Sequence, residues 1–247
     1  MSKAIIVPDL AYTSHKGRRG GSSNGYKEMS AKLKYFQYRD DADGHIPQEQ
    51  GLERWQDHGL GTNYREILDN CASLSSEKVL AWTWVLSPAP DLMALVPEAE
   101  REPLVIALTE DVVESYYEAR GVDKPLYSFV VHDRLTNEDE SDEERLHQVH
   151  THIVLPGTAS TLDGSQLPFY NRSQKGHVQL LRDIATERFS TELDRLVGPE
   201  WHTLRPEIVH EPLPEPELAE LPPIDYQRGL SVLDQWFGPH PPTRDIS

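Results

Sequence analysis

Three of the eleven histidines are spaced so that they could share one metal ion. His150 and His152 are separated by one residue in a segment typical of a strand, so both imidazoles project from the same face. His132 ends the preceding strand-like segment, and antiparallel pairing of the two segments would place it beside the other two. Three neutral imidazoles that leave coordination positions open are typical of a catalytic metal site. A solvent-facing histidine pair is the alternative interpretation, and His147 competes as the third ligand.

Tyr35 is the tyrosine best placed to act as a nucleophile on a phosphate. It lies in the basic segment Ser-Ala-Lys-Leu-Lys-Tyr-Phe-Gln-Tyr-Arg, which spans residues 30–39. Basic neighbours could hold a phosphate and favour the phenolate; they are Lys32, Lys34 and Arg39. Tyr38 lies one helical turn later and is an alternative or second nucleophile. From local context alone, either tyrosine could simply pack against the core.

Charge is unevenly distributed along the chain, whose formal net charge is −17. Residues 1–40 carry eight basic and three acidic side chains and are therefore net +5, which leaves −22 for the remainder. The glycine-rich part of this segment, with Lys16, Arg18 and Arg19, could wrap a phosphate backbone. A solvated loop is the alternative. The overall acidity argues against a protein that merely coats DNA or a membrane, because negative charge repels phosphates.

Length and composition narrow the class of protein further. A chain of 247 residues suits one large domain, or one domain with an extension. The single cysteine, Cys71, excludes a disulfide framework and a cysteine-rich zinc site, favours a cytoplasmic location, and lies on an apolar helical face typical of a core residue. No stretch approaches the roughly 20 apolar residues that span a bilayer. The N-terminus is expected to form a strand rather than a signal peptide.

Hydrophobic periodicity predicts the elements that must position these side chains. Strands are expected at 3–7, 79–86, 126–132 and 149–155, and helices at 26–38, 63–74, 98–120 and 174–196. This order predicts an α+β fold, with helices packed on a mainly antiparallel central sheet. We expect one compact domain over residues 1–205. Residues 206–247 contain nine of the 19 prolines and are expected to form an acidic linker with a short amphipathic element that docks on the domain or a partner.

Two segments resemble motifs of the plasmid mobilisation and conjugative relaxases, members of the three-histidine (HUH) endonuclease superfamily. Residues 30–39 resemble the tyrosine segment "AKA-x-Y-I-x-R" of these enzymes. The segments 127–132 and 149–155 resemble the strand pair that carries their histidine motif. The tyrosine precedes the histidines here, as in relaxases, whereas it follows them in the related rolling-circle replication initiators. The resemblance covers roughly residues 1–200.

The resemblance implies a metal-dependent DNA relaxase, that is, a single-strand endonuclease that also rejoins the strand. Tyr35, or Tyr38, would attack a phosphodiester of single-stranded DNA at a transfer origin and form a 5′-phosphotyrosine link. His132, His150 and His152 would hold a divalent ion, with Mg²⁺ or Mn²⁺ favoured over Zn²⁺. The DNA-binding residues would be Lys16, Arg18, Arg19, Lys32, Lys34 and Arg39. The C-terminal tail could recruit accessory mobilisation or coupling proteins.

Two other functions are compatible with these motifs. A rolling-circle replication initiator or transposase of the same class would need a tyrosine on the helix expected at 174–196, which contains none. A non-catalytic DNA-binding adaptor could keep the fold without the chemistry. Metal content separates the adaptor from the enzymes, because an adaptor has no need of a divalent ion.

Overall fold

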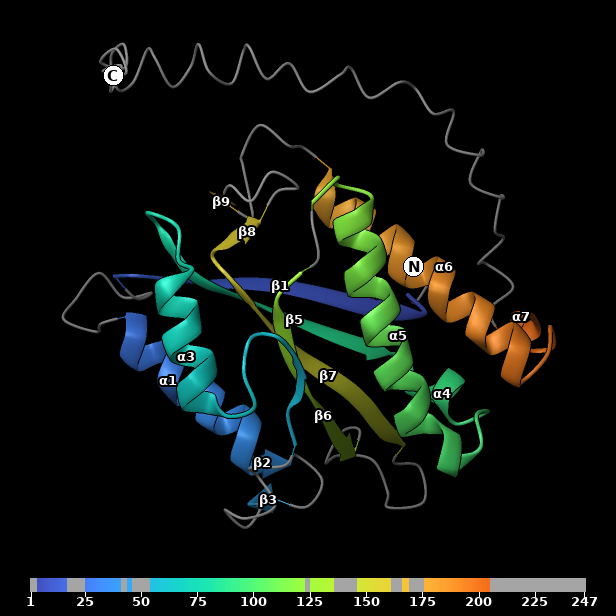
Figure 1. The fold of residues 1–247 in the computed structure, drawn as a ribbon. Coiled ribbons are helices and arrows are strands. Elements are labelled where there is room, and N and C mark those ends of the chain that lie inside the picture. Colours follow the sequence, from blue (N-terminus) through green and yellow to red (C-terminus); the bar gives the residue numbers. More distant parts are fainter. Residues whose placement is uncertain are drawn as a thin grey trace, which may run out of the picture. The chain divides into compact units, whose positions relative to one another are not determined.

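A five-stranded antiparallel sheet forms the centre of the protein, with strand order β1-β5-β7-β6-β4 (Figure 1). The computed structural model describes residues 4–16, 25–40, 44–45, 54–122, 125–135, 146–160, 166–168 and 176–204. The sheet strands are β1 (Ile6–Ser14), β4 (Gln56–His58), β5 (Val79–Pro88), β6 (Tyr127–Leu135) and β7 (His147–Pro156). Two short hairpins are formed by β2 (Arg39–Asp40) with β3 (Gly44–His45), and by β8 (Thr158–Ser160) with β9 (Gln166–Pro168).

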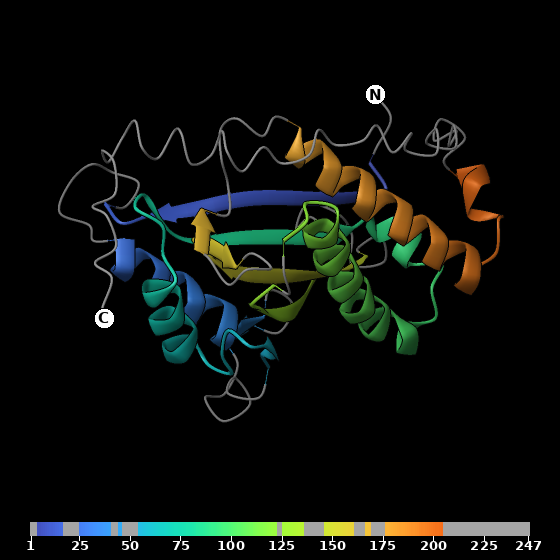
Figure 2. The same cartoon turned by 45° about the horizontal axis from the view of Figure 1, so that its top comes forward.

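The described residues form six helices: α1 (Gly25–Tyr38), α3 (Tyr64–Ser73), α4 (Pro90–Met93), α5 (Glu98–Glu118), α6 (His177–Leu196) and α7 (Trp201–Leu204). Four of them, α1 with α3 and α5 with α6, pack in two pairs against the sheet (Figure 1 and Figure 2). Successive strand residues point to opposite faces. On β5, Thr83 accepts a hydrogen bond from Lys32 of α1, whereas the next residue, Trp84, packs edge-on against Tyr116 of α5. The pair α1 and α3 therefore lies on one face, and α5 with α6 lies on the other.

Apolar residues at helical spacing join α1 and α3 to the sheet. Met29 and Leu33 of α1 and Ile67 and Cys71 of α3 are fully buried in one hydrophobic cluster. Burial raises the pKa of the Cys71 thiol to about 12, because an apolar environment disfavours the thiolate. Cys71 is thus a core residue, as the sequence predicts.

Helix α1 starts directly beside the end of β1, although ten residues, 15–24, separate the two elements in the sequence. The Gly25 N–H donates to the carbonyl of His15 over 3.0 Å. A side-chain Cβ at position 25 would collide with the carbonyl oxygen of Ser14. Only glycine permits this close approach, which fixes where the tyrosine-bearing helix begins relative to the sheet.

The predicted α+β class and its mainly antiparallel sheet are confirmed, and several elements differ from the prediction in their bounds. Strand β1 continues to Ser14 rather than ending at Val7, because an edge strand tolerates Pro8. The segment 40–61, for which the sequence predicts no helix or strand, contains β3 and β4, and β4 pairs with β6 over only three residues. Helix α4 was not predicted, because its four residues are too few to show a period.

The predicted C-terminal extension, 206–247, lies outside the described residues, so the proposed domain boundary near residue 205 stays a prediction. Within the described part of the chain, no helix is both long and apolar enough to span a membrane.

Candidate active site

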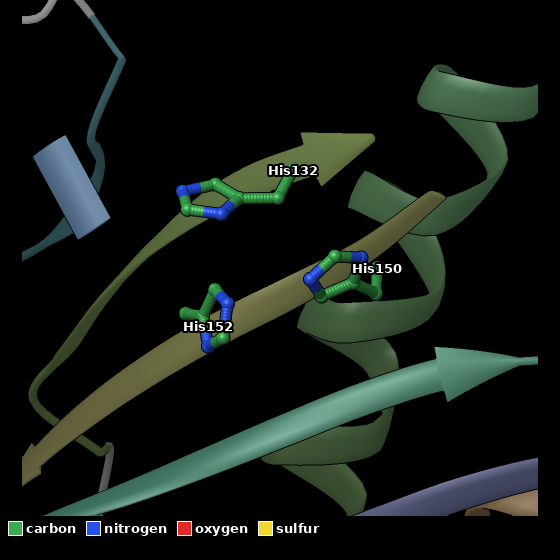
Figure 3. Close-up of side chains that lie close together, drawn as sticks. All are labelled: His132, His150 and His152. Atoms are coloured by element: carbon green, nitrogen blue, oxygen red, sulfur yellow. The ribbon is translucent and has the colours of Figure 1, made fainter. Parts of the chain in front are cut away.

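The three predicted histidines come together on one face of the sheet (Figure 3). Strands β6 and β7 pair antiparallel with His132 directly opposite His150, as expected, and His152 lies two residues further along β7. The ring centroid of His132 is 5.7 Å from that of His150 and 4.7 Å from that of His152, and the His150 and His152 centroids are 5.0 Å apart. One ring nitrogen of each histidine lies within 4.8 Å of the others. This spacing allows a single ion to contact all three rings.

Backbone carbonyls orient two of the rings. His132 Nε2 lies 2.8 Å from the carbonyl oxygen of Phe36, and His150 Nδ1 lies 2.9 Å from that of Gln148. A carbonyl oxygen can only accept, so each of these nitrogens carries the proton. The lone pair of the neutral ring is therefore on Nδ1 in His132 and on Nε2 in His150, and each is the nitrogen that can bind a metal.

His152 is held by stacking rather than by a backbone hydrogen bond. Its ring lies nearly parallel to that of Phe36, at a centroid distance of 4.2 Å. Its Nδ1 is buried and has no hydrogen-bond partner among the described residues. Burial lowers the pKa of His152 to about 2, with smaller contributions from His132, His150 and two arginines. The ring is thus neutral at neutral pH.

This donor set fits a divalent ion. Neutral imidazoles with defined lone pairs bind metals without first losing a proton. Imidazole nitrogen also suits Zn²⁺ and other transition ions better than Mg²⁺, which prefers oxygen ligands. A cluster made only of histidines is therefore better suited to a divalent transition-metal ion than to Mg²⁺.

The lowered pKa of His152 predicts a pH-dependent stability of the metal-free protein. The unfolded chain binds a proton at His152 near its ordinary pKa of about 6.5, whereas the folded protein does so only near 2. This contribution to stability is complete above pH 6.5 and is lost as the pH falls towards 2, by at most about 1.4 kcal/mol per pH unit. Urea unfolding between pH 4.5 and 7.5 with a chelator should show a weaker pH dependence for His152→Gln than for the wild type. His147→Gln serves as a matched control on the same strand; a pH dependence in His152→Gln equal to that of the wild type would contradict the prediction.

Helix α1 places Tyr35 beside the histidine cluster. The Tyr35 ring centroid is 6.1 Å from that of His132, and 39% of the residue surface is exposed. Tyr35 is therefore both close to the imidazoles and open to a large substrate. Tyr38 instead packs edge-on against Tyr64 of α3, at 6.2 Å between centroids. The structure thus brings Tyr35, and not Tyr38, into ring contact with the cluster.

The two lysines that precede Tyr35 on α1 have different neighbours. Lys32 is partly buried and its Nζ donates to Thr83 Oγ1 over 3.4 Å, on the sheet face that carries the histidines. Lys34 is exposed and its Nζ lies 5.2 Å from the centre of the Tyr64 ring. Lys16 is exposed after the end of β1. Arg18, Arg19 and the side chain of Arg39 lie outside the described residues.

His147, the competing third ligand, lies apart from the cluster. It begins β7, and its position in the strand places it on the opposite face from His150. Its Nδ1 is 2.6 Å from a carboxylate oxygen of Asp133. The strand pleat therefore decides between the two candidates, in favour of His132.

Sequence reasoning missed two groups at the site, the Phe36 carbonyl and Arg54. Arg54 Nη1 and Nη2 donate to the carbonyls of Phe36 and Val131 over 3.4 and 2.7 Å. A backbone carbonyl has no sequence signal. Arg54 lies in a segment for which the sequence predicts no helix or strand, so nothing local indicates its partners.

Comparison with known proteins identifies the fold. The sequence matches no family model and no curated protein. The structure is similar to the conjugative relaxase TrwC in its metal-bound complex with OriT DNA, with a TM-score of 0.50 and 16% identity over 77% of this chain and 70% of that chain. TrwC complexed with a 27-mer DNA comprising the recognition hairpin and the cleavage site gives a TM-score of 0.48, with 14% identity over 77% of this chain and 69% of that chain. A structure that describes vancomycin resistance transfer in Staphylococcus aureus gives 0.43, with 10% identity over 76% of this chain and 94% of that chain.

The likeness to TrwC in its metal-bound complex shows that this chain shares the fold of that conjugative relaxase. The fold implied by the sequence resemblance is therefore confirmed, with three clustered histidines on its central sheet.

Proposed function

We propose that this protein is a DNA relaxase, which nicks and rejoins single-stranded DNA at a transfer origin through a 5′-phosphotyrosine intermediate. The observation that carries the proposal is the position of Tyr35, partly exposed and 6.1 Å from the ring of His132 in a three-imidazole cluster. The relaxase fold supports it, as does the OriT DNA bound to TrwC in the metal-bound structure that this chain resembles. We further propose that the protein acts in the cytoplasm, where such a DNA substrate is found.

The proposed reaction is a transesterification. The Tyr35 hydroxyl oxygen attacks the scissile phosphorus and its proton passes to solvent, while the bond from phosphorus to the 3′ oxygen breaks. The leaving 3′ oxygen takes up a proton and becomes a free 3′-hydroxyl. Attack of a 3′-hydroxyl on the phosphotyrosine reverses these steps and rejoins the strand, so that no phosphodiester energy is lost to hydrolysis.

The chain's own residues orient the reactants. A divalent ion held by His132, His150 and His152 would polarise the phosphate and stabilise its developing charge. Lys32, which lies over the same sheet face, supplies a positive charge for the phosphate. Phe36 packs against His152 on the buried side of the helix, which directs the neighbouring Tyr35 towards solvent.

The test is incubation of the wild-type protein with labelled single-stranded oligonucleotides from the DNA that flanks its gene, with Mn²⁺, Zn²⁺ or Mg²⁺. A denaturing gel and intact mass should show a covalent protein–DNA adduct that maps to Tyr35 and that a chelator prevents. DNA binding without any adduct, across candidate origins and all three metals, would instead favour the non-catalytic adaptor.

A further inference from the structure

We propose that Arg54 is a positioning residue, which holds the helix that carries Tyr35 against the strand that carries His132. The expected effect of Arg54 on the rate of adduct formation rests on the proposed function, whereas its expected effect on metal binding by the histidine cluster rests on the geometry alone.

The Phe36 carbonyl is the point where helix and strand meet. It lies in the last turn of α1, where carbonyls lack intrahelical partners. It accepts hydrogen bonds from His132 Nε2, at 2.8 Å, and from Arg54 Nη1, at 3.4 Å. Arg54 Nη2 donates to the carbonyl of Val131 over 2.7 Å. One guanidinium thus joins the residue after Tyr35 to the residue before His132.

Arg54 occupies this place because the β4–β6 ladder stops early. The pairing ends with Gln56 opposite Phe129, and two further residues in the same register would bring residue 54 opposite Val131. The Arg54 side chain, rather than its backbone, reaches the Val131 carbonyl. The planar guanidinium can satisfy two carbonyls at once, which a lysine ammonium does with less defined geometry. The Val131 carbonyl at the edge of β6 thus has a hydrogen-bond donor, and the end of α1 still lies close enough to contact His132.

A second contact keeps α1 in place independently of Arg54. The buried Gln37 Oε1 accepts from Trp55 Nε1 over 3.0 Å and from the Tyr64 N–H over 2.7 Å. Together with the apolar cluster between α1 and α3, these bonds retain the helix when Arg54 is removed. We therefore expect the loss of Arg54 to shift the Phe36 carbonyl and Tyr35 without unfolding the protein.

Arg101 provides a matched control. Its guanidinium also donates to two carbonyls, those of Val96 and Ala94, over 3.0 and 3.4 Å, and it lines the same polar cavity of about 340 Å³ as Arg54. Neither carbonyl belongs to α1 or β6. Arg101→Ala therefore reproduces the loss of an arginine from this cavity without touching the link between Tyr35 and His132.

The experiment compares Arg54→Ala, Arg54→Lys and Arg101→Ala in four measurements: the single-turnover rate of adduct formation, the Kd for the oligonucleotide, Zn²⁺ affinity by calorimetry, and the melting temperature. Arg54→Ala should slow adduct formation by about 100-fold, the cost of a small misplacement of a reacting group, with an unchanged Kd. It should also weaken Zn²⁺ binding by at least about 10-fold, because the Phe36 carbonyl no longer orients His132. Arg101→Ala should keep the wild-type rate of adduct formation and the wild-type Zn²⁺ affinity.

Chemical rescue separates positioning from a general structural role. Guanidinium ion at millimolar concentration, which the cavity can admit, should restore much of the rate in Arg54→Ala but not in Arg54→Lys. Equal losses of rate and melting temperature in Arg54→Ala and Arg101→Ala, without rescue, would overturn the proposal. If the wild type forms no adduct, the proposed function fails, and Zn²⁺ affinity decides the inference alone: a selective loss in Arg54→Ala supports it, and unchanged affinity overturns it.

Discussion

Replacing Tyr35 with phenylalanine is expected to abolish the covalent protein–DNA adduct while DNA binding stays nearly intact. The substitution removes only the hydroxyl oxygen that would attack the phosphorus. The ring, which lies 6.1 Å from that of His132, is retained. Loss of a covalent nucleophile costs far more than the loss of one binding contact, so we expect a rate decrease on the order of 10³-fold or more. Single-turnover cleavage of a labelled oligonucleotide and its Kd measure the two quantities separately.

Tyr38→Phe is the matched control for this experiment. Both tyrosines lie on α1, but Tyr38 packs against Tyr64 and not against the histidine cluster. We expect Tyr38→Phe to form the adduct at nearly the wild-type rate. If Tyr35→Phe still nicks DNA and Tyr38→Phe does not, Tyr38 is the nucleophile. The proposed reaction geometry, which places the attacking oxygen beside His132, would then be wrong.

Removal of His150 should have the second large effect, on metal binding. His150→Ala deletes one of the three imidazoles whose nitrogens lie within 4.8 Å of one another. Loss of an outer-shell partner already weakens a metal site by about 10- to 100-fold, and loss of a ligand should exceed that range. Calorimetry with Zn²⁺ and Mn²⁺ should therefore show affinity reduced by more than about 100-fold, and adduct formation should fall with it.

His147→Ala is the control on the same strand. His147 lies on the opposite face of β7 and contacts Asp133, so its removal should leave metal affinity unchanged. Metal bound by His150→Ala with wild-type stoichiometry and affinity would exclude the three-histidine site. Since His150 is almost fully buried, a circular dichroism spectrum of the variant must match the wild type before the affinities are compared.

The two experiments test different parts of the proposed mechanism. Tyr35→Phe should bind metal and DNA without reacting, whereas His150→Ala should retain the nucleophile and lose the metal. A non-catalytic adaptor would form no adduct, and its DNA binding would not change with either substitution.

The sequence by itself determined the features that depend on local periodicity. The apolar spacing of Met29, Leu33 and Phe36 predicts α1, and β-forming runs predict β5, β6 and β7 to within a few residues. The period of two along a strand is enough to place His150 and His152 on one face. The order of the tyrosine and the histidines, a property of the chain alone, favours the relaxases over the related replication initiators.

Only the tertiary structure decided which groups meet across the sheet. Local sequence favours Tyr35 but leaves Tyr38 as an alternative, and the direction in which α1 packs places Tyr35 beside His132 and Tyr38 beside Tyr64. The roles of Arg54 and of the Phe36 carbonyl arise from contacts between residues 18 and 96 positions apart along the chain. Such contacts depend on how helices and strands dock, which is set by the summed burial of many side chains and has no signature in any short segment.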